Sequence, residues 1–467
     1  MTYIALTIGP IYKTLSNAKK TRELWGGSYL FSYVMREIIA TFKEREFIVP
    51  YIKDKTIFDS GREVGLFHDR FIFESKDGDK ETLEKVVNSV LQNLADNTKL
   101  NLEFLTSYLQ IYIVEKELEN GKNPILELTP YLDTAELFYT VGQHKENPLS
   151  NMLTGNNSFL TKDAFGASKS FPSLPEIAMH DIDAVNVKSL LKDDELEVYD
   201  NSELKPHLKP YHKYYAIVHA DGDSMGKVVE KLKGKDDFQN FSKKLFEYCT
   251  TSHKLISNFG GETIFAGGDD LLFFAPVVSG DKTIFDLCEE ISKDFDESFK
   301  DEATLSFGVS MQYYKFPLYE ALEKSRNLLF DDAKTGAKNN IAFSVTKHSG
   351  QTFKAIIHKG DKELYENFKL FSSNIKGGEG LDNFLGSLHH KLDTHKIVLS
   401  RIGKDKERLK AFFDNYFNND EHKQYEEIFT QMIDFMYEAY SNNEPKEALE
   451  TVYATLRFVK FIQGAKS

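Results

Sequence analysis

The sequence of 467 residues contains only two cysteines and one tryptophan, and it has no long hydrophobic run. Two cysteines, Cys249 and Cys288, are too few for a disulfide framework or a four-cysteine zinc site. We therefore expect a reducing, cytoplasmic location. No apolar run approaches the roughly 18 residues of a membrane-spanning helix. The N-terminus also lacks the basic and apolar regions of a secretory signal, so we expect no contact with a membrane.

Basic residues are outnumbered, since 58 lysines and arginines face 72 aspartates and glutamates, which gives a net charge of −14. Independent binding of nucleic acid depends on neutralising phosphates, and this charge argues against it. We expect the chain to contact RNA mainly through partner proteins. The remaining composition, 41% hydrophobic and 28% charged, is that of a globular protein. The length predicts about three domains.

Hydrophobic patterning divides the chain into four regions, which together predict an α+β fold. In residues 1–141 we expect strands at 3–8 and 65–74 and helices at 12–41 and 82–118, the first broken at Gly26-Gly27. Residues 142–210 are rich in Asn, Ser, Gly and Pro in their first part, which predicts an irregular connection. Residues 348–467 show helical periodicity and predict a helical C-terminal domain.

Residues 211–347 carry the pattern β-α-β-β-α-β of a ferredoxin-like unit. The predicted elements are a strand at 213–220, a helix at 236–259, two strands within 262–276, a helix at 282–300, a strand at 303–314 and a helix at 318–335. The opening segment of the chain has a similar strand-then-helix order, which suggests a degenerate second copy of this unit.

Two motifs of this unit, HADGDSMGK (219–227) and FAGGDDLLFF (265–274), are acidic. The first strand and the central hairpin are neighbours in such a sheet, so we expect Asp221, Asp269 and Asp270 to converge, with Asp223 on the same side. Clustered carboxylates need a cation, and oxygen ligands select Mg²⁺ or Mn²⁺. Two such ions can activate a hydroxyl and stabilise a leaving pyrophosphate. The three converging aspartates are therefore our candidate catalytic and metal-binding residues.

Residues suited to phosphate lie around these motifs. Gly222, Gly267 and Gly268 allow a triphosphate to approach the backbone closely. Lys334 and Lys338, in AKTGAKNNIAF, are spaced to hold the β- and γ-phosphates. With Asp223 they are our candidate nucleotide-binding residues. The alternatives are a simple hairpin turn for Gly-Gly-Asp-Asp and a solvated helix face for the lysines.

These segments resemble the large palm-domain subunit of type III CRISPR effector complexes, most closely the type III-B form. The resemblance also rests on IGPIYKTLSNAKKTRELWGGSYL (8–30), GLFHDRF (65–71), SFPSLPEIA (170–178) and TLRFVKFIQG (455–464). It implies two facing palm domains, a degenerate one in 1–141 and an active one in 211–347, with ATP bound between them. It further implies that target RNA, paired with guide RNA among the other subunits, activates synthesis of oligoadenylate second messengers, usually cyclic.

Two departures from this family matter. Many relatives begin with an HD nuclease domain, whereas the first strand here starts at residue 3, so we expect no such nuclease and interpret His68-Asp69 as part of a strand edge. Many relatives also carry a four-cysteine zinc site between the palms. Here Cys249 and Cys288 are expected to be core thiols, and no zinc is expected.

Several alternatives stay open at this point. The enzyme could join AMP from ATP to S-adenosylmethionine, or the chain could be a structural subunit or a free-standing diguanylate or adenylate cyclase. The basic stretch Lys13, Lys19, Lys20 and Arg22 could contact nucleotide or guide RNA, or it could be a solvated helix face. The apolar stripe at 429–436 could dock a partner subunit or pack within the C-terminal domain.

Overall fold

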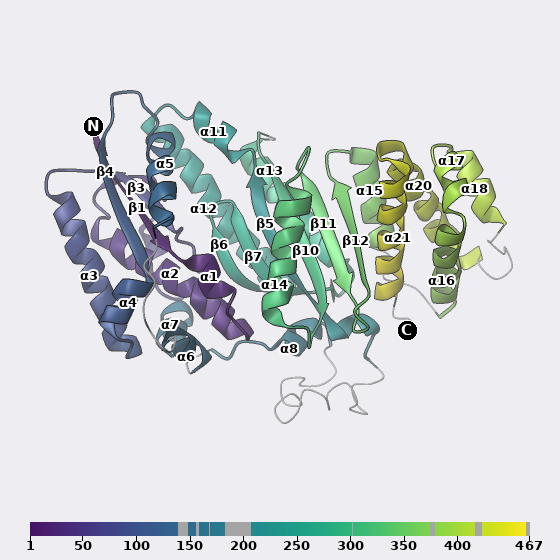
Figure 1. Cartoon of the computed structure of the whole chain (residues 1–467), viewed down its shortest axis with the longest axis horizontal. Coiled ribbons are helices and arrows are strands. Elements are labelled where there is room, and N and C mark those ends of the chain that lie inside the picture. Colours follow the sequence, from purple (N-terminus) through teal and green to yellow (C-terminus); the bar gives the residue numbers. More distant parts are fainter. Residues whose placement is uncertain are drawn as a thin grey trace.

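The computed structural model describes residues 1–138, 148–155, 158–167, 169–182, 207–300, 302–373, 379–415 and 423–463. Figure 1 shows three parts along the long axis of the molecule. A four-stranded sheet with its helices lies at the N-terminal end, a six-stranded sheet lies in the middle, and a group of helices lies at the C-terminal end.

The N-terminal sheet is antiparallel and has the strand order β2-β3-β1-β4, which is the order of a ferredoxin-like unit. Strand β1 is central because its run of apolar residues is buried, whereas β4 is half-exposed at the edge. The elements are β1 (Thr2–Gly9), α1 (Ile11–Leu15), α2 (Thr21–Thr41), β2 (Glu46–Val49), a 3-10 turn (Lys55–Phe58), β3 (Arg70–Glu74), α3 (Asp79–Thr98), α4 (Leu102–Tyr108), β4 (Gln110–Glu117) and α5 (Pro124–Glu136).

Two predictions for this region are wrong in part. The helix expected over 82–118 ends at Tyr108, and β4 follows it because Ile111 and Ile113 alternate with polar residues. The break expected at Gly26-Gly27 lies instead between α1 and α2. A Cβ atom at Gly27 would lie 3.4 Å from side-chain atoms of α1, so this glycine serves close helix packing inside α2.

The connection between the sheets is not irregular throughout, which corrects the prediction for 142–210. Its described parts form α6 (Pro148–Thr154), α7 (Ser158–Phe165) and α8 (Leu174–Ala178), followed by a 3-10 turn (Pro210–Lys213). The part of the prediction that falls on 183–206 lies outside the described residues. Phe165 and Phe171 pack on Trp25 of α2, with ring centroids 5.3 and 4.6 Å away. The connection therefore follows the N-terminal domain closely.

The six-stranded sheet has the order β12-β11-β10-β5-β7-β6. Its core of β5, β6, β7 and β10 repeats the ferredoxin-like order, and β11 joins parallel to β10. The elements are β5 (Tyr214–Asp223), α11 (Met225–Lys231), α12 (Lys235–Asn258), β6 (Glu262–Gly267), β7 (Asp270–Pro276), β8 (Val278–Ser279), β9 (Lys282–Thr283), α13 (Ile284–Phe299), β10 (Thr304–Tyr313), α14 (Leu318–Asn327), a π-helical turn (Leu328–Ala333), β11 (Asn340–Thr346) and β12 (Thr352–His358).

The two faces of this sheet belong to different cores. Ala216, Val218 and Phe273 lie on the face covered by α12 and α13. Tyr215 and Ile217 lie on the other face and share a core with the N-terminal domain. The N-terminal domain therefore packs directly on the face of β5 that also carries Asp221, because alternate residues of a strand face the same side.

The C-terminal helices are α15 (Lys362–Ser372), α16 (Glu379–Thr394), α17 (Lys396–Ile402), α18 (Lys406–Asp414), a 3-10 turn (Lys423–Tyr425), α20 (Glu426–Asn442) and α21 (Pro445–Ile462). Phe458 of α21 lies 4.8 Å from Phe285 of α13, measured between ring centroids, so these helices and the six-stranded sheet share one core. Strand β12 pairs with β11, so the sheet continues past residue 348, where only helices were expected.

The apolar stripe of α20 lies inside the chain. Phe429, Met432, Phe435 and Met436 are buried among the C-terminal helices, so the alternative of internal packing is confirmed and partner docking through this stripe is wrong. Both cysteines are buried and unpaired, as expected for core thiols. Within the described part of the chain, no helix has the length and apolar character needed to cross a membrane.

Candidate functional site

The two acidic motifs meet at one end of the six-stranded sheet, as the sequence predicts. Ala220 of β5 pairs with Leu271 of β7, so the next positions along the strands are Asp221 and Asp270. Gly222 lies against the hairpin, because a Cβ atom placed there would be 2.7 Å from Asp269 Oδ2. Gly222 therefore permits the close approach between the β5 end and the hairpin.

The hairpin turn is held from two sides. Gly268 has a φ of +70°, a conformation that glycine adopts without strain. Behind it, the Cys249 thiol of α12 donates a hydrogen bond to the Gly268 carbonyl oxygen at 3.3 Å. In front, a Cβ atom at Gly268 would lie 2.3 Å from His68 Cε1 of the N-terminal domain. A Cβ atom at Gly267 would clash with the Phe265 ring. The turn is thus fixed by both domains.

Lys334 contacts the carboxylates of the β5 end. Its ammonium group forms an ion pair with Asp221, lies 3.9 Å from Asp223 Oδ1 and donates to the Gly222 carbonyl at 2.8 Å. The π-helical turn presents it there, since the Lys334 amide bonds to Leu329 O. Burial, together with the smaller effect of the nearby Lys338 charge, lowers the pKa of Lys334 to about 8.

Asp223 is tied into the fold more than the sequence suggests. Its Oδ2 accepts hydrogen bonds from Thr304 Oγ1 at 3.0 Å, Ser306 Oγ at 2.7 Å and the Asn339 amide at 2.9 Å. Its Oδ1 is buried and makes no hydrogen bond with the described residues. Asp223 therefore holds the segment after Lys334 in place and leaves one oxygen directed toward the lysine.

Backbone strain gathers in the loops beside these groups. Ser224, Lys338 and Asn339 all have positive φ, between 54° and 61°, although none is a glycine. Such conformations cost energy and persist where the surrounding contacts fix them. Lys334 and Lys338 consequently do not lie on one helix face, which the i,i+4 spacing had suggested; they lie on a turn between the π-helical segment and β11.

The carboxylates of the hairpin repel each other, and their surroundings disfavour the charged forms. Burial and the charge of Asp270 raise the pKa of Asp269 to about 7, while hydrogen bonds from backbone amides oppose the rise. Burial and Asp69 raise the pKa of Asp270 to about 7 as well. The Asp270 side chain is exposed at the surface, so water screens this repulsion. A cation would favour the ionised forms of both.

Sequence reasoning missed the contribution of His68 and Asp69. They were interpreted as a strand edge, but they precede β3 and face the hairpin of the other domain. Burial raises the pKa of Asp69 to about 6 and lowers the pKa of His68 to about 4. The sequence does show a pair of ionisable residues next to a buried strand, which could have indicated a functional role. Only the tertiary structure shows that they face the hairpin.

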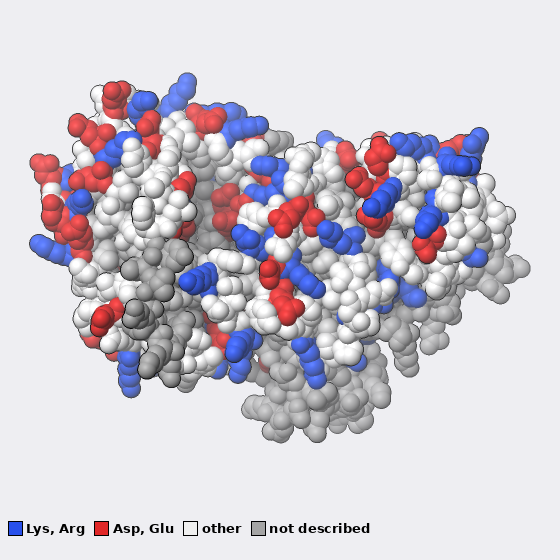
Figure 2. Space-filling view, viewed as in Figure 1, with Lys and Arg blue, Asp and Glu red and all other residues white. Residues whose placement is uncertain are grey.

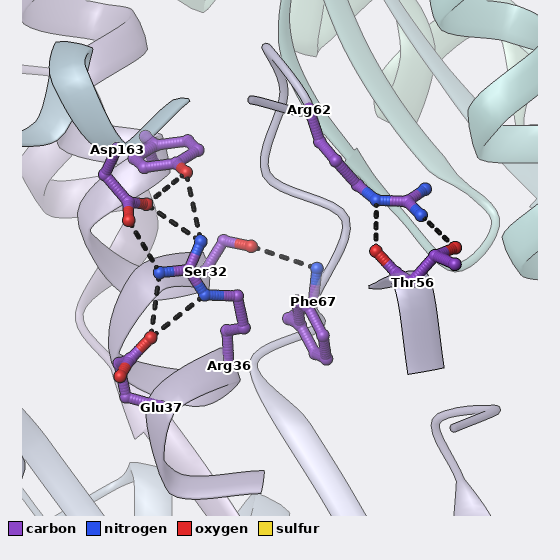
Figure 3. Close-up of polar contacts among 8 residues, drawn as sticks. Ser32, Arg36, Glu37, Thr56, Arg62, Phe67 and Asp163 are labelled. Carbon is purple, nitrogen blue, oxygen red and sulfur yellow. Dashed lines mark hydrogen bonds and ion pairs between the residues drawn. The ribbon is translucent and has the colours of Figure 1, made fainter. Parts of the chain in front are cut away.

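The loop that carries His68 is held by α2, as Figure 3 shows. The Phe67 amide donates to Ser32 Oγ at 3.0 Å, and Arg62 bonds to Thr56 within the same loop. One turn further along α2, Arg36 pairs with Asp163 of α7 at 2.8 Å and with Glu37. A single helix thus positions both the connection and the residues that meet the hairpin.

The donor chemistry of the site suits a hard cation, although the carboxylates are not gathered around one point. Among the described residues, no group of three or more His, Cys, Asp or Glu side chains is arranged to hold a metal ion. Asp221 is paired with Lys334. Asp223 Oδ1 nevertheless has no hydrogen-bond partner among the described residues, and the pKa values of the hairpin aspartates are raised. These carboxylate oxygens could therefore accept the positive charge of a hard cation.

A recess separates the N-terminal part from the six-stranded part on one face of the molecule, with acidic side chains on its walls (Figure 2). Such a recess between two domains is the usual place for a small-molecule site.

Segments from both sheets match models of known protein families. Residues 214–342 match the model described as Cas10/Cmr2, second palm domain, and residues 3–99 match the N-terminal region of CRISPR-associated protein Cmr2. Both segments are therefore similar to Cas10/Cmr2 proteins. The resemblance to the large palm-domain subunit of type III CRISPR complexes is thereby confirmed.

A curated Cas10/Cmr2 relative is the CRISPR system Cmr subunit Cmr2 of Pyrococcus furiosus. It is 30% identical over 291 residues, which cover 54% of this chain and 32% of the relative. The chain thus spans about a third of that protein's length in the alignment.

Solved structures share the fold at low identity. A Csm1-Csm4 cassette in complex with one ATP gives a TM-score of 0.59 at 12% identity, covering 99% of this chain and 70% of that one. The same cassette with cA4 gives 0.57, also at 99% and 70% coverage and 13% identity. The apo state of a type III-B Cmr-beta complex gives 0.54 at 12% identity, over 76% and 70% of the chains. The predicted α+β fold of two palm domains and C-terminal helices is confirmed.

Proposed function

We propose that this chain is the nucleotidyltransferase subunit of a type III CRISPR effector complex. In this proposal, target RNA activates the conversion of ATP into adenylate second messengers, cyclic oligoadenylate in the first instance, with release of pyrophosphate. The chain acts in the cytoplasm with other type III-B subunits, which supply the guide RNA and the target RNA. The observation that carries the proposal is the meeting of Asp221, the Gly-Gly-Asp-Asp hairpin and Lys334 at one sheet edge.

The proposed roles follow from charge and position. Asp221, Asp269 and Asp270 would hold one or two Mg²⁺ or Mn²⁺ ions, which supply activation of the attacking hydroxyl and stabilise the leaving pyrophosphate. Lys334, now paired with Asp221, would turn to the triphosphate once a metal ion neutralises that carboxylate. Lys338 lies near enough to Lys334 to add a second positive charge. Gly222, Gly267 and Gly268 let the phosphates approach the backbone, and Asp223 holds the lysine segment.

The related structures support a nucleotide substrate. The Csm1-Csm4 cassette is described with ATP and with cA4, and the Pyrococcus relative is a Cmr subunit. An alternative product is AMP joined to S-adenosylmethionine, which needs the same carboxylates and a different acceptor. A structural subunit that only binds nucleotide is the second alternative. The burial of charge at the hairpin argues for chemistry, because a purely structural turn gains nothing from raised carboxylate pKa values.

The test is a product analysis with the reconstituted complex. Labelled ATP is incubated with and without target RNA, and with and without S-adenosylmethionine, and the products are identified by mass. We expect RNA-dependent adenylate products that disappear in Asp269→Asn/Asp270→Asn. Unchanged product formation in that double variant would leave only the structural role. Full activity of the isolated chain without RNA would instead favour a free-standing cyclase.

A further inference from the structure

An arginine flanked by two aromatic rings bridges the two domains beside the acidic site. The guanidinium carbon of Arg326 lies 4.7 Å from the centroid of the Tyr12 ring and 5.0 Å from that of Phe330. Tyr12 belongs to α1 of the N-terminal domain, whereas Arg326 and Phe330 belong to α14 and the π-helical turn after it. Figure 1 shows α1 next to α14. We refer to these three residues as the Arg326 cluster.

The Arg326 cluster is open to solvent and has unused binding capacity. Tyr12 and Phe330 are each 42% exposed, and Arg326 is exposed as well. Within the described part of the chain, the Arg326 side chain makes no hydrogen bond or ion pair, although the protein is rich in carboxylates. Aromatic rings and guanidinium planes of this kind are the surfaces on which unpaired nucleobases stack. A scattered exposed aromatic residue needs no explanation, but two converging on an unpaired arginine form a platform.

The platform borders the acidic site through His219. Ser325, the neighbour of Arg326, forms a hydrogen bond with His219 Nδ1 at 2.8 Å. His219 precedes Asp221 by two positions on β5, so the two side chains face the same side about 6–7 Å apart. Lys334 contacts Asp221 and the Gly222 carbonyl, which is the opposite direction along the strand. Asp221 therefore lies between Lys334 and the Arg326 cluster.

This order along the strand fits the geometry of nucleotidyl transfer. The attacking hydroxyl and the leaving pyrophosphate lie on opposite sides of the reacting phosphorus. If the pyrophosphate is held at Lys334, the acceptor approaches from the His219 side. The bond from the acceptor oxygen to the α-phosphorus then forms as the bond from that phosphorus to the pyrophosphate oxygen breaks, and the hydroxyl proton leaves to solvent.

We propose that Tyr12, Arg326 and Phe330 bind the adenine ring of the acceptor molecule, with His219 at the edge of this subsite. The inference rests on the proposed function and deepens it by naming the residues that select the acceptor. Adenine is carried by ATP and by S-adenosylmethionine alike. The chemistry recognised is the same purine ring, so the two acceptors are separated by experiment.

The test uses the reconstituted complex with target RNA and two variants, Tyr12→Ala and Phe330→Ala. Steady-state kinetics are measured with ATP alone, and with S-adenosylmethionine varied at saturating ATP. We expect KM for the true acceptor to rise at least fivefold in each variant, with kcat changed less than twofold, because stacking binds the ring without touching the reacting atoms. The ligand whose KM rises, ATP or S-adenosylmethionine, is the acceptor. In Tyr12→Phe, which keeps the aromatic ring, KM should return to the wild-type value.

Tyr319→Ala is the matched control. Tyr319 is 49% exposed on the same helix, but its hydroxyl bonds to Glu320 and it lies outside the Arg326 cluster. Its KM should stay within twofold of the wild-type value. An unchanged KM in Tyr12→Ala and Phe330→Ala, or an equal rise in Tyr319→Ala, would overturn the proposal.

A binding measurement separates this inference from the proposed function. Calorimetry reports the affinity of ATP and of S-adenosylmethionine for the complex carrying Asp269→Asn, alone and combined with Tyr12→Ala or Phe330→Ala. If the wild-type complex makes no adenylate product, the proposed function fails and the Arg326 cluster is judged on affinity alone. A fall of at least fivefold for one of the two ligands supports the subsite, and equal affinities reject it.

Discussion

Replacing Asp269 by asparagine should stabilise the metal-free protein while it removes the proposed activity. A rise in the pKa of Asp269 from 3.8 to about 7 corresponds to about 4 kcal/mol of penalty for the ionised form in the folded state. Water reaches this half-buried carboxylate and its exposed neighbour Asp270, so screening reduces the gain in Asp269→Asn to about 1–2 kcal/mol. Asparagine keeps the size of the side chain and removes the charge.

The pH dependence of the free energy of unfolding follows from the direction of this pKa shift. A carboxyl whose pKa is raised on folding costs nothing well below pH 3.8, where it is protonated in both states, and very little at pH 4. It costs progressively more as pH rises through 4 to 7, and the full amount above 7. The difference in free energy of unfolding between Asp269→Asn and wild type should therefore be largest at pH 8 and vanish near pH 4.

The assay is urea unfolding in chelator at several pH values, repeated with millimolar Mg²⁺. Magnesium should stabilise the wild type, since ligands that bind only the folded state raise its stability, and it should leave Asp269→Asn almost unchanged. Asp281→Asn, in the exposed turn between β8 and β9, is the control and should show neither effect. If Asp269→Asn is no more stable than wild type at pH 8 in chelator, the argument from charge repulsion is refuted.

Three further predictions concern packing in the site and along α2. Gly222→Ala should reduce activity about 100-fold with little loss of stability, measured by product formation and urea unfolding, because its Cβ would displace the Asp269 carboxylate. Gly268→Ala should destabilise the fold by about 1–2 kcal/mol, and adding His68→Ala should recover part of that loss in a double-mutant cycle. Asp163→Ala should cost about 3 kcal/mol in urea unfolding, since it leaves the buried Arg36 with Glu37 and a 3.5 Å hydrogen bond to the Tyr29 hydroxyl; a loss below 1 kcal/mol would show that these two partners suffice.

Much of the second palm could be predicted because its local signals agree with its tertiary structure. The strands around the Gly-Gly-Asp-Asp turn are short and mostly apolar, and the Asp-Gly-Asp motif ends a buried strand, so strand order alone brings Asp221 to the hairpin. The same reasoning failed at the edges of both sheets. Strands β4 and β12 are half-exposed, and their alternating residues were counted within longer helical patterns.

Contacts between domains could not be read from the sequence. His68 and Asp69 look unremarkable beside β3, and their importance depends on which surface of the N-terminal domain faces the hairpin. The placement of Lys334 depends on a π-helical turn, a rare conformation with no distinct sequence pattern. The lysine spacing therefore does not reflect a shared helix face, and the role of Lys334 and Lys338 in phosphate binding stays a prediction.

The contact between α13 and α21 limits how far the protein can be shortened. Phe285 and Phe343 of the six-stranded part are covered by Phe458, close to the C-terminal end of the described residues. A truncated fragment that stopped after β12 would leave these rings in water and promote aggregation. Any shortened form of this protein must keep α21 or carry a redesigned surface in its place.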